Sequence, residues 1–218
     1  MKEAISNMTF EQRQFYRHLT VIFCIWAFFG AIVGAFAGSG IRMTKLSKDP
    51  AQLASFPIYY GLLSNLGILV WAAGGIISLF ASFHVEGAKI RSLLRWAGIL
   101  TLILLLDDFF LIHDILFPKV LRLPEWLVYL FYLVAFPLFF LRHLKPIFGQ
   151  TEYRILALGV FLLGLSFLID MNVLPGGIDV EDGFKLAGMV AYSYYWIVTS
   201  HELITQPAQS PFSEALSQ

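Results

Sequence analysis

Long hydrophobic runs separated by short polar segments dominate this chain. No Asp, Glu, Lys or Arg occurs from His18 to Ile41, and further apolar runs begin near residues 57, 96, 126, 154 and 183. An α-helix needs about 20 apolar residues to cross the ~30 Å hydrocarbon core of a bilayer. The pattern therefore predicts an all-α, polytopic integral membrane protein with about six transmembrane helices, over residues 18–41, 57–83, 96–117, 126–142, 154–174 and 183–204.

The two ends of the chain differ from the apolar runs. Residues 1–17 are polar and mixed in charge, which predicts an N-terminal segment at the membrane interface. Residues 205–218 contain two prolines and little apolar surface, which predicts a disordered tail. No internal repeat and no soluble domain are evident, so we expect one membrane domain over residues 18–204.

Composition supports a lipid environment. Hydrophobic residues make up 58% of the chain and charged residues only 14%, against about 25% charged residues in soluble domains. Lys plus Arg equals Asp plus Glu at 15 each, so the net charge suggests neither nucleic acid nor an acidic partner, and the hydrophobic composition predicts membrane lipid as the partner. The single cysteine, Cys24, excludes an intrachain disulfide.

Basic residues predict the orientation, because they accumulate on the cytoplasmic side of membrane proteins. With six spans, nine of them lie on the side of the termini, namely Lys2, Arg13, Arg17, Lys89, Arg91, Arg95, Arg142, Lys145 and Arg154. Six lie on the other side, namely Arg42, Lys45, Lys48, Lys119, Arg122 and Lys185. This bias predicts that both termini are cytoplasmic.

The third predicted span carries an acidic stretch, with Asp107, Asp108, His113 and Asp114 among apolar residues. A charge at bilayer depth costs at least ~2.5–3.5 kcal/mol, so such residues usually face a protein interior, a partner or water. In a continuous helix Asp107 and Asp114 share a face, whereas Asp108 and His113 point away from it on opposite sides. We therefore expect any site here to need groups from other spans.

Polar residues of three other spans are predicted to lie in the same leaflet. Ser64 and Asn65 lie one to two turns into the second span, Asp170 lies near the end of the fifth, and Lys185 and Tyr192 lie in the first half of the sixth. We expect them to form the substrate-binding part of a shared site with the acidic stretch. Lys185 is the expected counter-ion of the carboxylates.

Three functions remain open at this stage. Carboxylates with one imidazole suit a divalent metal, and a carboxylate or imidazole can act as a general base. Asp107, Asp108, His113 and Asp114 could thus serve a metal-dependent enzyme acting on a lipid or other amphipathic substrate. The same residues could conduct ions in a proton- or cation-coupled transporter or channel, or form a structural network with Lys185.

A glycine repeat in the first predicted span suggests a further role, in assembly with other chains. Gly30, Gly34 and Gly38 recur every four residues and would form a groove for close helix packing. This face predicts a homo-oligomer or an accessory subunit of a larger membrane complex.

Overall fold

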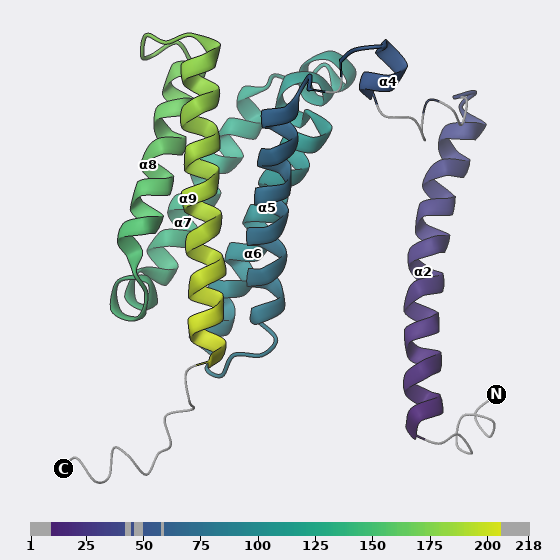
Figure 1. Ribbon diagram of the computed structural model, residues 1–218, viewed down its shortest axis with the longest axis vertical. Helices are drawn as coiled ribbons and strands as arrows, with labels where there is room; N and C mark the ends of the chain where they lie inside the picture. Colours follow the sequence, from purple (N-terminus) through teal and green to yellow (C-terminus); the bar gives the residue numbers. More distant parts are fainter. Residues whose placement is uncertain (1–9, 42–44, 46–49, 58, 206–218) are drawn as a thin grey trace. The chain divides into compact units, whose positions relative to one another are not determined.

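The computed structural model describes residues 10–41, 45, 50–57 and 59–205, and all its regular elements in that part of the chain are helical (Figure 1). The all-α prediction is therefore confirmed. Residues 1–9 of the predicted N-terminal segment, and residues 206–218 of the predicted tail, lie outside the described residues.

The chain divides into two compact units, residues 1–60 and 61–218. The first unit contains helix α2 (Phe10–Gly38) and the short helix α4 (Pro50–Ala54). Helix α2 starts well before the predicted span. Apart from neighbouring residues and the backbone of α2 itself, no heavy atom of the described chain lies within 4 Å of a Cβ added at Gly30, Gly34 or Gly38, so the packing role of these glycines stays a prediction.

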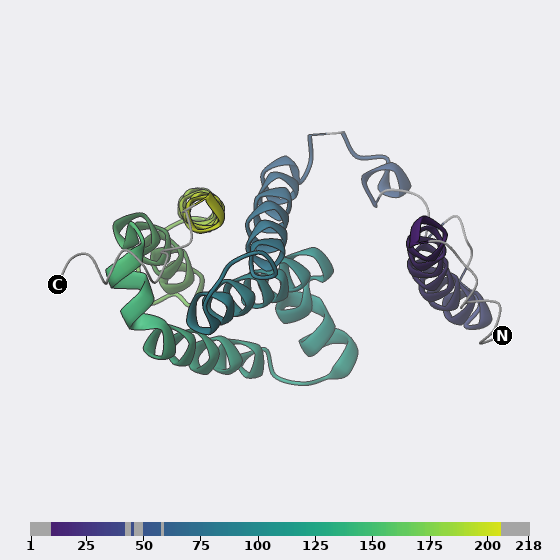
Figure 2. The ribbon, with the colours of Figure 1, turned by 90° about the horizontal axis from the view of Figure 1, so that it is seen from below.

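The second unit is a helical bundle (Figure 2). Helix α9 packs against α5 and α8, α5 packs against α6, and α7 contacts α6. The elements are α5 (Leu62–Ala81), α6 (Ala88–Phe110), the π-helix η1 (Ile112–Leu121), α7 (Trp126–Gln150), α8 (Tyr153–Asp170) and α9 (Ile178–Thr205).

Large aromatic side chains of α9 form the centre of this bundle. Tyr192, Tyr195 and Trp196 follow one another at helical spacing and are each at most 1% exposed. Small residues let the neighbouring backbones approach them. A Cβ added at Gly159 of α8 would lie 2.7 Å from the backbone nitrogen of Tyr192, so glycine is needed for this helix contact.

Four helices in the described part of the chain are long and apolar enough to cross a membrane. They are α5, α7, α8 and the Tyr16–Gly38 portion of α2. Helices α6 and α9, which carry Asp107, Asp108, Lys185 and Tyr192 of the predicted site, are not among the four. The composition of the helices therefore supports a membrane protein.

The predicted continuous helix over residues 96–117 is wrong. Helix α6 begins at Ala88 and ends at Phe110, and Leu111 takes the left-handed conformation with φ 49° and ψ 49°. The N–H of Leu111 bonds the carbonyl oxygen of Asp107, which closes the helix, and the π-helix η1 continues the chain to Leu121. The angles calculated for a continuous helix therefore do not apply beyond Phe110.

Helix α7 also differs from the prediction, which ended this span at residue 142 with an interruption at Pro137. The helix runs through Pro137 to Gln150 and kinks at His143, whose φ is −115° and ψ is 15°. A proline ring clashes with the preceding turn, so Pro146 explains a kink at this position. The Nδ1 of His143 lies 2.9 Å from the carbonyl oxygen of Phe139 and satisfies it.

Candidate functional site

Asp107 is the most deeply buried carboxylate that the structure describes at this site, with 4% of its surface exposed. It accepts a hydrogen bond of 2.8 Å from the hydroxyl of Tyr132 on α7. It also accepts one of 3.0 Å from the backbone N–H of His113. The left-handed conformation of Leu111 ends α6 between Asp107 and His113. This change of direction allows the backbone N–H of His113 to donate to the Asp107 side chain.

His113 connects Asp107 to the surface of the bundle. Its Nδ1 lies 3.0 Å from Oδ1 of Asp107, within ion-pair distance but without the alignment of a hydrogen bond. Its Nε2 lies 3.4 Å from Oδ2 of Asp114, whose side chain is 57% exposed. The imidazole therefore sits between one buried and one exposed carboxylate, an arrangement that the angles of a continuous helix did not allow.

Asp108 faces different partners from its neighbour. The indole N–H of Trp71 on α5 donates to Oδ2 at 3.0 Å. The expected counter-ion, Lys185 of α9, donates to Oδ1 at 2.9 Å. Asp108 thus joins three helices, α5, α6 and α9, through one carboxylate.

A small cavity of about 80 Å³ opens beside this ion pair. Its polar lining comes from Ser64 of α5, Asp108 of α6, and Asp182 and Lys185 of α9. Leu63, Leu186 and Met189 form the apolar part of the wall. Ser64, Asp108 and Lys185 are therefore brought together here, as part of the predicted site.

The other predicted binding residues lie outside this cavity. Asn65 is exposed and does not line it. Asp170 accepts a hydrogen bond of 3.3 Å from the hydroxyl of Tyr129. Tyr192 is 1% exposed and contacts Trp71 edge-on at 5.4 Å between ring centroids. The expectation that Tyr192 shares a cavity with Lys185 is not met, because its ring belongs to the bundle core.

Sequence reasoning missed Trp71, Tyr132 and Asp182 as members of the site. Signals for all three exist in the sequence. Tyr132 is one of two polar side chains in an apolar helix, and buried Trp and Tyr side chains usually find hydrogen-bond partners. Asp182 precedes Lys185 by three residues, which places both on one helical face.

The four predicted metal ligands do not form one ligand set. Within the described ranges, no group of three or more His, Cys, Asp or Glu residues could hold a metal ion. Asp107 is directed to Tyr132 and His113, while Asp108 is directed to Trp71 and Lys185. The arrangement thus gives no geometric support to the predicted divalent metal.

Further carboxylates crowd the same end of the bundle. Glu181 precedes the predicted span 183–204. Burial, and then the nearby carboxylates of Asp170 and Asp182, raise the pKa of Glu181. Asp114 contributes in the same direction. The end of the bundle beside the cavity therefore carries several carboxylates.

Comparison with known proteins places this architecture in a family. The family model described as "Domain of unknown function (DUF8692)" matches residues 19–199. The chain belongs to this family. The matched range includes α5 to α8, most of α2 and α9, and every residue of the site described above. No curated protein and no solved structure matches the chain.

Proposed function

We propose that this protein is a membrane-embedded enzyme in which His113 is the general base, acting on a lipid or other amphipathic substrate. The observation that carries the proposal is the buried Asp107 carboxylate 3.0 Å from Nδ1 of His113. In many hydrolytic sites a carboxylate lies beside the imidazole nitrogen that faces away from the substrate.

Each residue has a defined part in this mechanism. Tyr132 and the backbone N–H of His113 hold Asp107 by hydrogen bonds of 2.8 Å and 3.0 Å. Asp107 lies at ion-pair distance from the imidazole and stabilises its protonated form by its negative charge. Nε2 then takes a proton from a substrate hydroxyl or from water, and the exposed Asp114 passes it to solvent. Proton transfer by a positioned base contributes about 10²–10⁴-fold to a rate.

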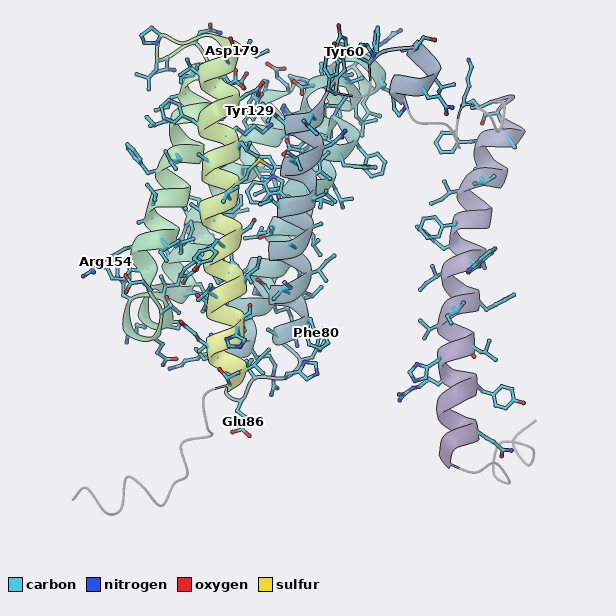
Figure 3. All side chains as sticks on the ribbon, in the orientation of Figure 1. Tyr60, Phe80, Glu86, Tyr129, Arg154 and Asp179 are labelled. Atoms are coloured by element: carbon cyan, nitrogen blue, oxygen red, sulfur yellow. The ribbon has the colours of Figure 1, made fainter. Side chains whose placement is uncertain are left out.

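The proposal includes six membrane-spanning helices with cytoplasmic termini. Charge within the second unit supports it, because acidic and basic side chains gather at opposite ends. Figure 3 shows Glu86 at one end of the bundle and Arg154 in the same half, with Asp179 and Tyr129 in the other half. The first end has six basic residues against three acidic ones, and the second has six acidic residues against three basic ones. The first set is Lys89, Arg91, Arg95, Arg142, Lys145 and Arg154 against Glu86, Glu152 and Glu202, and the second is Asp114, Glu125, Asp170, Asp179, Glu181 and Asp182 against Lys119, Arg122 and Lys185. The first end is then the cytoplasmic one.

The test is lipid conversion by the purified full chain. The protein is incubated with vesicles of a total lipid extract, and lipid products are followed by mass spectrometry. We expect His113→Gln to lower product formation about 10²–10⁴-fold. The matched control is His84→Gln, because His84 is exposed and follows α5 at the opposite end of the bundle. No conversion by the wild type, or equal conversion by His113→Gln, would contradict the proposal.

The broken helix favours a second candidate, a proton- or cation-coupled transporter. Many transporters place their coupling ions at interrupted helices, and α6 is interrupted at Leu111, four residues after Asp107. Proton flux into the same vesicles, measured with an internal pH dye, distinguishes the two. Flux that is lost in Asp107→Asn, without any lipid conversion, would favour transport.

A further inference from the structure

We propose that the cavity beside Lys185 binds the primary ammonium group of an amphiphile. The cavity is lined by Ser64, Asp108, Asp182 and Lys185, with apolar Leu63, Leu186 and Met189. The inference rests on the proposed function, because it names the headgroup of the substrate. It concerns binding, so it can be tested separately from catalysis.

Charge in the cavity favours a cation. Lys185 is engaged by Asp108 at 2.9 Å, so this pair is close to neutral. In the part of the chain that the structure describes, no Lys, Arg or His lies within ion-pair distance of Asp182. One carboxylate is therefore in excess. An anionic headgroup would have to approach Asp108 and Asp182, whereas an ammonium group would supply the missing positive charge.

The size and polarity of the cavity favour a primary ammonium over larger cations. About 80 Å³ is the volume of a few water molecules at ~30 Å³ each. This suffices for an ammonium group with its first carbon atoms. The three N–H bonds of such a group can be directed to the hydroxyl of Ser64 and to carboxylate oxygens. The side chains of Leu63, Leu186 and Met189 suit the carbon atoms that follow.

The position of the cavity relates it to the proposed base. Asp108 lines the cavity and Asp107 holds His113, and the two are consecutive on α6. A headgroup bound at Asp108 and Asp182 therefore contacts the residue next to Asp107, the carboxylate beside the proposed base. The substrate class that fits both the cavity and the proposed base is an amphiphile with a polar group next to its amine.

The experiment measures binding by isothermal titration calorimetry on the purified full chain in a neutral detergent at pH 7. Dodecylamine is the probe, and we expect saturable binding. Asp182→Asn should weaken it about tenfold, the loss expected for one charge-assisted hydrogen bond. Asp179→Asn is the matched control, because Asp179 carries the same charge in the first turn of α9 but does not line the cavity. Asp182→Glu keeps the charge and should keep binding.

Three further ligands sharpen the test. Dodecyltrimethylammonium has the same charge and chain but no N–H, and we expect it to bind at least about tenfold more weakly. Dodecyl phosphate tests whether an anionic headgroup binds. Ethylamine tests whether a small amine without an alkyl chain binds equally well. Binding of dodecyl phosphate above dodecylamine would overturn the inference, and so would equal weakening by Asp179→Asn. If ethylamine binds as tightly as dodecylamine, the ligand need not be an amphiphile, and that part of the inference would be overturned.

The outcomes separate this inference from the proposed enzyme. Dodecylamine binding that depends on Asp182, together with no lipid conversion, would support the site and reject the enzyme. Lipid conversion that depends on His113, together with no dodecylamine binding, would support the enzyme and reject the site.

Discussion

Two consecutive carboxylates, Asp107 and Asp108, have separate roles at this site. Asp107 has partners from α7 and from the chain just beyond the break, Tyr132 and His113. Asp108 has partners from α5 and α9, Trp71 and Lys185. Consecutive helical residues point about 100° apart, so one step along α6 separates the proposed base from the proposed binding cavity.

The ion pair between Asp108 and Lys185 yields a prediction on stability. Lys185→Met should lower the free energy of unfolding by about 1 kcal/mol, because it leaves a half-buried carboxylate unpaired. The value is modest because the side chain of Lys185 is 38% exposed and water screens the pair. Adding Asp108→Asn should restore most of the loss. Unfolding in mixed micelles, followed by circular dichroism, measures the two single variants, Lys185→Met and Asp108→Asn, and the double variant.

These variants form a double-mutant cycle, and its control is Lys119→Met on η1. Lys119 is exposed, so removing its charge should leave the free energy of unfolding nearly unchanged. If the effects of Lys185→Met and Asp108→Asn simply add, the two residues do not interact energetically and the pair is not a stabilising contact.

At the scale of the element, the decisive feature is the end of α6 at Leu111. A left-handed conformation is unfavourable for a residue with a Cβ by roughly 1–2 kcal/mol. The surrounding contacts must offset this cost, and the bond from the His113 N–H to Asp107 is one of them. The break places His113 beside Asp107, so local backbone strain here coincides with the candidate site.

Leu111→Gly should therefore stabilise the protein by about 1 kcal/mol, because glycine adopts positive φ without a Cβ penalty. Leu106→Gly is the matched comparison within α6 and should destabilise it by about 1 kcal/mol, the helix-propensity cost of glycine. The two leucines are 43% and 44% exposed, so they lose similar contacts. Equal destabilisation in micelle unfolding experiments would show that Leu111 is not left-handed.

At the scale of the whole molecule, the second unit is polarised. Basic residues predominate where α6 begins and α7 ends, whereas acidic residues gather where α8 ends and α9 begins. In a membrane protein this asymmetry sets the orientation, because positively charged connections stay in the cytoplasm. The proposed site, beside the acidic end, would then face the outer leaflet.

Cysteine labelling tests this orientation. Cys24 is the only native cysteine, so Cys24→Ser provides a background for single substitutions. We expect a membrane-impermeant maleimide to label Asp179→Cys in intact cells. Glu86→Cys should be labelled only after permeabilisation, because three proposed crossings separate the two positions. Labelling of both positions in intact cells would contradict the six-span topology.

The order of residues alone predicts the helical class, the approximate helix positions and the end of the helical bundle at which Ser64, Asp108 and Lys185 lie. These properties depend on hydrophobicity summed along short segments, which the order of residues specifies directly. Ser64, Asp108 and Lys185 could be predicted to converge for that reason.

The contacts between individual polar groups depend on how the helices pack and cannot be obtained from the order of residues. The partners of Asp107 depend on the turn at Leu111 and on Tyr132, a residue 25 positions along the chain. The kink at His143 and the burial of Tyr192 likewise follow from packing between helices. A periodic pattern assumes a regular helix, so it cannot report where long-range contacts offset a local break. In this protein the proposed base is formed by such a break.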